Sequence, residues 1–261
     1  MKTFIAFTLL ALAPNAHAKI VEKNVDYKDA NGVVLEGFVA YDDAKHGKLP
    51  GVMIVHEWTG LGDYVKERAR MLAKLGYVAF GADIYGKGIR PTAPKEAGEV
   101  ATKYKAGDRA RLRARAFAGL DELKKQPKVD PSRLAALGYC FGGTTVLELA
   151  RAGADLRGVA SFHGGLETNT PAEAGSVKAK VVAFHGAEDP TMSAEVVKGF
   201  GDEMRKAKAD WTFTEYSGAF HSFTNPHAVG KDAMPGMAEY NAAADQRSWA
   251  SLQSFLQEWF K

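Results

Sequence analysis

Apolar and polar positions change along this chain from strict alternation to short apolar runs separated by longer amphipathic segments. Residues 19–41 alternate around Asp29-Ala30-Asn31-Gly32, which predicts two strands joined by a tight turn. Six apolar runs then predict strands at residues 51–56, 77–82, 134–139, 158–162, 181–185 and 211–216. Helical spacing of apolar residues predicts helices at residues 63–75, 109–125, 141–152, 193–207 and 243–260.

This order of elements favours an α/β fold. Strands alternate with helices, so we expect a mostly parallel central sheet with an antiparallel N-terminal hairpin and helices on both faces. Residues 86–98 contain glycines and two prolines, which predicts a loop near the pocket. Ligands bind beyond the carboxyl ends of parallel strands, so the residues that follow each apolar run are the candidates for chemistry. Residues 19–261 are long enough for one large core, and we expect a single domain.

The start of the chain has the order of a secretory signal peptide. Lys2 precedes a mostly apolar stretch, and Ala16-His17-Ala18 forms a small-residue cleavage site. The apolar stretch is much shorter than the roughly 20 residues that cross a bilayer. We therefore expect residues 1–18 to be removed, leaving no membrane anchor. The periplasm is the simplest destination, and full secretion is the alternative.

Charge identifies no partner, whereas the cysteine count is informative. Removing residues 1–18 lowers the formal net charge from +3 to +2, and the basic run at 109–115 alternates Arg with Ala and Leu, as on a solvated helix face. We expect no nucleic-acid binding, a small-molecule substrate and a monomer. Cys140 is the single cysteine, so no internal disulfide can form in an oxidising compartment. A lone cysteine is usually a small buried apolar residue, but the neighbours of Cys140 indicate another role.

Gly138-Tyr139-Cys140-Phe141-Gly142 follows a predicted strand and opens a predicted helix. It matches the Gly-x-nucleophile-x-Gly elbow with Cys in place of Ser, and the glycines leave room for the sharp turn. The helix N-terminus favours a thiolate at Cys140, and the amide of Phe141 would face an oxyanion.

A thiolate nucleophile needs a base and an acid, which follow it in the chain in α/β-hydrolases. Asp189 lies in the segment His185-Gly186-Ala187-Glu188-Asp189-Pro190 after a predicted strand, with Glu188 as the competing acid. His221 lies in Gly218-Ala219-Phe220-His221-Ser222-Phe223 after the last predicted strand. The other histidines lack metal-ligand spacing, so we expect no metal and no cofactor.

These segments, together with Val55-His56-Glu57-Trp58-Thr59-Gly60, resemble the dienelactone hydrolase family from about Val33 to the C-terminus. The resemblance implies a triad of Cys140, Asp189 and His221. It further implies that Glu57 interacts with the thiol and helps to activate it, and that the amides of Trp58 and Phe141 form the oxyanion hole.

The resemblance is weaker in the segments that would bind the substrate. The best-known members hold a substrate carboxylate with two arginines, but the matching regions here read Asp83-Ile84-Tyr85-Gly86-Lys87 and His221-Ser222-Phe223-Thr224-Asn225. Lys87 offers a point charge without the bidentate fork of Arg. Tyr85, Lys87 and Ser222 are therefore the candidates for substrate binding, and a neutral or weakly anionic ester is expected.

Three functions remain open at this stage. The first is hydrolysis of small esters or lactones through an acyl-thioester on Cys140. The second is a redox or binding role for the exported thiol on a hydrolase scaffold, since a fold does not prove an activity. The third is a carboxylesterase with a broader acyl range, which shares the mechanism and differs in the pocket.

Overall fold

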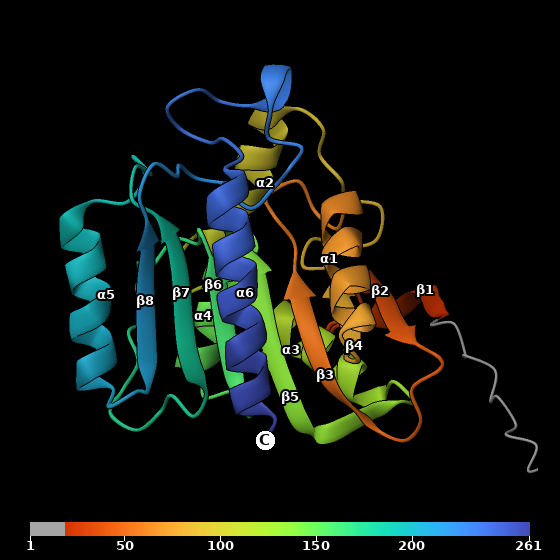
Figure 1. Ribbon diagram of the computed structural model, residues 1–261. Helices are drawn as coiled ribbons and strands as arrows, with labels where there is room; N and C mark the ends of the chain where they lie inside the picture. Colours follow the sequence, from red (N-terminus) through yellow and green to blue (C-terminus); the bar gives the residue numbers. More distant parts are fainter. Residues whose placement is uncertain (1–18) are drawn as a thin grey trace, which may run out of the picture.

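One eight-stranded sheet runs through residues 19–261, the part of the chain that this computed structural model describes (Figure 1). The expected signal peptide, residues 1–18, lies outside the described residues. The strands are β1 (Ile20–Lys28), β2 (Val34–Asp42), β3 (Leu49–Val55), β4 (Val78–Ala82), β5 (Val129–Tyr139), β6 (Gly158–Phe162), β7 (Lys180–Gly186) and β8 (Trp211–Tyr216). Their spatial order is β1-β2-β4-β3-β5-β6-β7-β8.

The N-terminal hairpin is confirmed. β1 pairs antiparallel with β2, and β2 pairs antiparallel with β4, whereas every later pair is parallel. The carboxylate of Asp29 accepts hydrogen bonds from the amides of Asn31 and Val33, and Gly32 takes the positive φ that closes the turn. The turn is therefore specified by the residues that form it.

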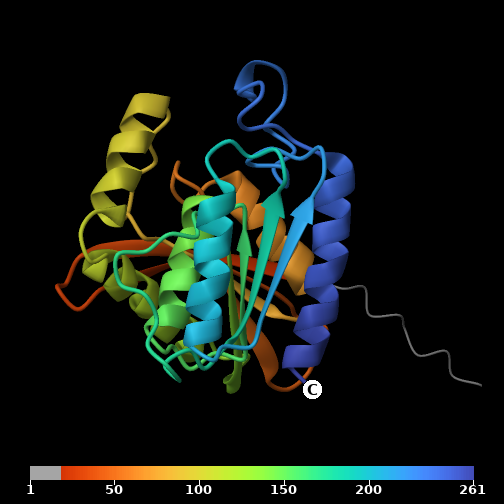
Figure 2. The same cartoon turned by 90° about the vertical axis from the view of Figure 1, so that its left-hand side faces the viewer.

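Helices cover both faces of the sheet, as expected (Figure 2). One face carries α1 (Asp63–Lys74) and α6 (Ala242–Trp259), and the other carries α3 (Ala110–Lys125), α4 (Phe141–Arg151) and α5 (Ala194–Lys206). Buried side chains of β3 alternate between the two cores: Val52 and Ile54 face α1, and Met53 and Val55 face α3 and α4. This two-sided burial explains the continuous apolar runs of the parallel strands.

The prediction of a loop at residues 86–98 is wrong at its C-terminal end, because α2 (Pro94–Lys105) begins at Pro94. Proline has no amide hydrogen and a fixed φ, so it fits the first turn of a helix. Ala97, Ala101 and Tyr104 are the buried residues of α2. The helix rises above the carboxyl ends of the strands and projects from the body of the molecule (Figures 1 and 2).

Between β8 and α6 the chain forms a loop with a short 3-10 helix, η1 (Gly230–Asp232).

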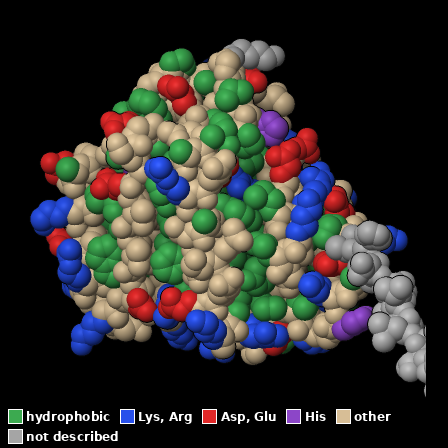
Figure 3. Space-filling view, viewed as in Figure 1, with side chains coloured by type: hydrophobic (Ala, Val, Ile, Leu, Met, Phe, Trp, Pro, Cys, Tyr) green, Lys and Arg blue, Asp and Glu red, His purple; other side chains and the backbone are tan. Residues whose placement is uncertain are grey.

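On the face viewed in Figure 3, acidic and basic side chains are interspersed around patches of hydrophobic side chains. Within residues 19–261, no helix is long and apolar enough to cross a membrane.

Candidate active site

Cys140 occupies a strained turn between β5 and α4. Its φ is 54°, in the left-handed region that residues with a Cβ rarely adopt. A Cβ on Gly138 would lie 2.1 Å from the carbonyl oxygen of Gly142, and a Cβ on Gly142 would lie 2.1 Å from that of Val55. The two glycines are therefore needed because backbone passes within contact distance on both sides of the turn.

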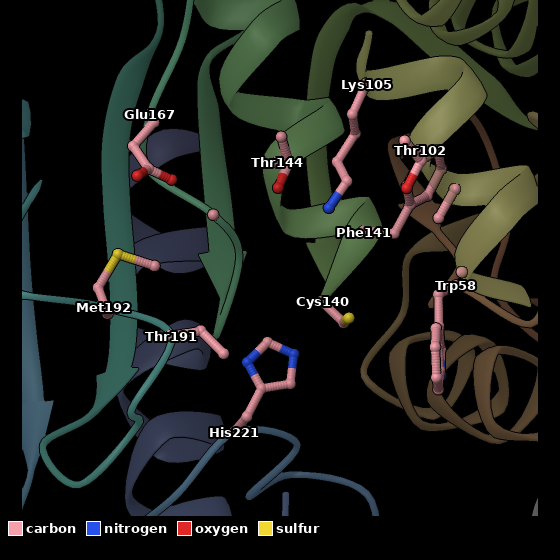
Figure 4. Close-up of a pocket in the computed structure, with 13 residues that line it drawn as sticks. Trp58, Thr102, Lys105, Cys140, Phe141, Thr144, Glu167, Thr191, Met192 and His221 are labelled. Carbon is pink, nitrogen blue, oxygen red and sulfur yellow. The ribbon is translucent and has the colours of Figure 1, made fainter. Parts of the chain in front are cut away.

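Asp189 and His221 come together from loops that follow β7 and β8. Asp189 Oδ2 lies 2.8 Å from His221 Nδ1. Thr191 donates to Asp189 Oδ1 from both its amide and its hydroxyl, which fixes the carboxylate. The imidazole of His221 faces the sulfur of Cys140 across the mouth of the cavity (Figure 4). Thiol, imidazole and carboxylate thus form one line of three groups.

The electrostatics of this line favour an anionic acid and a cationic base. Burial favours the neutral form of Asp189, but contacts from His185, His221 and Thr191 outweigh it and hold the pKa of Asp189 well below its usual range. Burial also opposes the charge on His221, but Cys140 and Asp189 outweigh it and raise the pKa of His221 to about 10. The arrangement can therefore support a thiolate beside an imidazolium.

Glu188, the competing acid, lies outside this line. Its carboxylate is exposed and accepts a hydrogen bond from the amide of Gly218 at 3.4 Å. Asp189 is 4% exposed and directly contacts the His221 ring. The geometry favours Asp189.

Glu57 follows β3 and lies among the loops of the site. Its Oε2 accepts a hydrogen bond of 2.8 Å from Nδ2 of Asn225. Burial raises the pKa of Glu57 to about 7, although His221 and the Asn225 hydrogen bond oppose the shift. Near neutral pH the side chain can therefore exchange a proton, a property suited to the thiol-activating role that the sequence suggests.

The amides of Trp58 and Phe141 are available as donors. Neither donates a hydrogen bond to a backbone or side-chain acceptor within residues 19–261. Phe141 is the first residue of α4, where the helix leaves its amide free. The loop that carries Trp58 is held by His56, whose Nε2 accepts from the amide of Ile84 and whose Nδ1 donates to the carbonyl of Glu57. Burial lowers the pKa of His56 to about 4, so His56 is a neutral structural group.

A cavity of about 290 Å³ opens in front of Cys140 and His221. Its walls come from α2, from α4 and from the loops after β3, β6 and β7: Trp58, Gly98, Ala101, Thr102, Lys105, Phe141, Thr144, Gly165, Glu167, Thr191 and Met192. The amine of Lys105 points into the cavity toward Cys140, and Glu167 lies on the opposite wall (Figure 4).

None of the three predicted substrate-binding residues is among the residues that line this cavity. Tyr85 is 1% exposed, and its hydroxyl donates to the carbonyl of Trp58, so it holds the loop that carries Trp58. Lys87 extends over the hairpin, where its amine pairs with Asp26 and Glu36. Ser222 follows His221 with a positive φ of 57°, and it does not contribute to the cavity lining.

The sequence interpretation did not include several of the residues that line the cavity. Lys105 and Thr102 belong to α2, which was partly assigned to a loop and otherwise not assigned. Pro94 followed by small or aromatic residues at 97, 101 and 104 was the available signal for this helix. Thr144 lies shortly after Cys140 and Thr191 shortly after Asp189, so both could have been identified as neighbours of the predicted triad.

Within residues 19–261, no group of three or more His, Cys, Asp or Glu side chains could hold a metal ion.

Comparison with known proteins agrees with the fold and the order of motifs. The profile of the dienelactone hydrolase family matches residues 35–260. A dienelactone hydrolase-like promiscuous phosphotriesterase from metagenomic libraries is 41% identical, with a TM-score of 0.86, over 93% of this chain and 99% of that chain. A putative carboxymethylenebutenolidase of Methylorubrum extorquens is 27% identical over all of this chain and 92% of its own length.

A probable 2-oxo-3-(5-oxofuran-2-ylidene)propanoate lactonase of Bradyrhizobium is 27% identical over 80% of this chain and 84% of its own length. The family match extends over most of the chain and includes every motif of the candidate site. The chain therefore belongs to the dienelactone hydrolase family of α/β-hydrolases.

Proposed function

We propose that this hydrolase cleaves small carboxylic esters or lactones with Cys140 as nucleophile, His221 as base and Asp189 as the orienting acid. The observation that carries the proposal is the line from Asp189 through His221 to the strained Cys140 turn. Nucleophile, base and acid in this order form the general arrangement of covalent acyl transfer.

The reaction proceeds in two halves. The Cys140 thiolate attacks the carbonyl carbon, forming a C–S bond, while the amides of Trp58 and Phe141 bind the oxyanion. Collapse breaks the ester C–O bond, and the His221 imidazolium gives its proton to the departing oxygen. Water then attacks the thioester as His221 removes one of its protons. Breaking of the C–S bond releases the acid and restores the Cys140 thiolate.

The cavity supports a small substrate. A space of about 290 Å³ lies at the lower end of the range for small-molecule pockets. Short acyl groups should therefore be preferred over long ones, which separates this proposal from a carboxylesterase of broad acyl range.

The test is hydrolysis of p-nitrophenyl esters of increasing chain length and of a dienelactone. The protein is assayed before and after iodoacetamide, with Cys140→Ala alongside. We expect turnover that iodoacetamide abolishes and that Cys140→Ala lowers by roughly 10³-fold or more. Full activity in Cys140→Ala would exclude Cys140 as nucleophile. Rapid alkylation of Cys140 without any turnover would favour the redox or binding role.

A phosphotriester is a second candidate substrate, because the 41% identical relative is a promiscuous phosphotriesterase. Attack of the thiolate on phosphorus would form an S–P bond and release the alcohol, with the same two amides binding the phosphoryl oxygen. Water activated by His221 would then break the S–P bond, releasing the phosphodiester and restoring the Cys140 thiolate. Release of p-nitrophenol from diethyl p-nitrophenyl phosphate, sensitive to iodoacetamide, would support it. Absence of release at high enzyme concentration would limit the protein to carboxylic substrates.

Export remains part of the proposal. Lys2, the apolar stretch and Ala16-His17-Ala18 support cleavage after Ala18 and delivery to the periplasm. The N-terminal sequence of the protein recovered from a periplasmic extract should begin at Lys19.

A further inference from the structure

A buried histidine outside the triad connects the nucleophile to the loop of the base. His163 follows β6 and is fully buried. The amide of Cys140 donates a bifurcated hydrogen bond, to the carbonyl of Phe162 at 3.0 Å and to Nδ1 of His163 at 3.1 Å. Nε2 lies 2.8 Å from Oγ1 of Thr224, which is three residues beyond His221. The His163 ring also packs edge-on against His221, with the centroids 5.1 Å apart.

These contacts determine where the proton of His163 lies. Because an amide N–H faces Nδ1, that nitrogen accepts, and the proton sits on Nε2 and is donated to Thr224. Burial lowers the pKa of His163 well below its usual range, and the neighbouring His221 and His185 act in the same direction. The ring therefore stays neutral beside the cationic form of His221.

The far end of this connection is held firmly. Oγ1 of Thr224 lies 2.7 Å from the Tyr64 hydroxyl, and Nε of Arg68 donates to that hydroxyl at 3.2 Å. Arg68 also pairs with Asp245 on α6. The loop after His221 is thus tied to α1 and α6 at one end and to the Cys140 turn, through His163, at the other.

We propose that His163 is a positioning residue that bridges the Cys140 amide and the His221 loop and so sets the separation of thiol and imidazole. This inference rests on the proposed function, because it gives His163 a role in the same thiol chemistry. The charged and titratable groups around His163 are Cys140 on the turn, His221, His185 and Asp189 on the loops and strand ends, and Arg68 on α1.

Four variants separate the contacts of the bridge. His163→Phe keeps a ring but loses both hydrogen bonds, and His163→Asn keeps an acceptor near Nδ1 but cannot reach Thr224. Thr224→Val removes only the far acceptor. Ser248→Ala on α6 is the control, because it loses a buried side-chain hydrogen bond that touches neither His163 nor Thr224.

Two measurements are made on each variant: steady-state ester hydrolysis and the rate of Cys140 alkylation by iodoacetamide as a function of pH. For His163→Phe we expect kcat to fall between about 10-fold and 100-fold with KM nearly unchanged. Its alkylation profile should move upward by about one pH unit, because a displaced His221 stabilises the thiolate less. His163→Asn and Thr224→Val should show smaller shifts, and Ser248→Ala should lose thermal stability alone.

A wild-type kcat and alkylation profile in His163→Phe would overturn the proposal and leave His163 as a packing residue. The alkylation profile needs no substrate. A shifted profile in a protein that hydrolyses no ester would therefore support the bridge while rejecting the proposed function.

Discussion

The turn around Cys140 and the helix α2 form two walls of one cavity, yet they are built differently. The turn is enclosed by backbone at about van der Waals contact, and the residues of α4 behind it are all buried. Three residues of α2 are buried, and the hydroxyl of Tyr104 anchors the helix to the carbonyl of Tyr85. The comparison suggests that the rigid wall carries the reaction chemistry and the loosely held wall selects the substrate.

The largest effect on activity should come from Asp189, the acid that orients His221 beside the Cys140 turn. Asp189→Asn keeps the size of the side chain but cannot hold the His221 tautomer and cation as the carboxylate does. We expect kcat for p-nitrophenyl acetate to fall by about 10³-fold to 10⁴-fold. Glu188→Gln is the control and should retain most activity, because Glu188 is exposed. Equal losses in both variants would mean that the acid was wrongly assigned.

The next effect compares one glycine from each wall. Gly142→Ala brings a Cβ to 2.1 Å from the Val55 carbonyl, whereas Gly98→Ala on α2 brings a Cβ only to 3.9 Å from the Trp58 ring. We expect Gly142→Ala to lower the free energy of unfolding by at least about 1–3 kcal/mol and to abolish activity. Gly98→Ala should leave the fold unchanged or stabilise it by up to about 1 kcal/mol, through helix propensity. Urea denaturation measures the free energy of unfolding of both variants. Similar losses of stability in the two would mean that the Cys140 turn and α2 tolerate an added Cβ equally well.

A smaller effect, on KM, is expected from replacing Lys105, whose positive charge should favour substrates that carry a carboxylate. Its amine points into the cavity toward Cys140. Lys105→Met should raise KM for aryl esters with a free carboxylate by roughly 3-fold to 10-fold, since a partly exposed ion pair contributes about 1 kcal/mol. KM for uncharged esters should stay constant. Lys103→Met, on the same helix but outside this cavity, is the matched control. A change for both ester classes would indicate displacement of α2 instead of a lost charge.

The last comparison concerns Glu57, which follows β3 and accepts a hydrogen bond from Asn225. Its pKa of about 7 lies above the ordinary value of 4.5, so the folded state holds a proton that the unfolded state releases. Stability from this group is therefore complete below about pH 4.5 and is lost as the pH rises through 7.

In wild-type protein the melting temperature should fall more between pH 5 and pH 8 than in Glu57→Gln. A difference of about 5–10 °C is expected for a chain of this size, because a folded pKa of about 7 against an unfolded pKa of 4.5 changes stability by roughly 2–3 kcal/mol between pH 5 and pH 8. Differential scanning fluorimetry in matched buffers gives the comparison, and identical slopes would show that Glu57 does not titrate in this range.

Most of the local structure was predictable because it depends on neighbouring residues. The hairpin followed from Asp29 and Gly32, the strands from apolar runs, and the turn at Cys140 from its flanking glycines. The region from residue 86 to Lys105 was harder, since Pro91 and Pro94 suggest a loop while Pro94 also suits the start of a helix.

The sequence by itself determined the fold class, the family resemblance and the order of Cys140, Asp189 and His221, because strand period, turn residues and motif order are properties of short segments. Only the tertiary structure decided that Lys87 pairs with Asp26 on the hairpin while Lys105 enters the cavity. It also decided that His163 joins the Cys140 amide to Thr224, 61 residues further along the chain. The reason is that such contacts depend on distances between segments far apart in sequence, which the packing of the whole sheet and its helices sets.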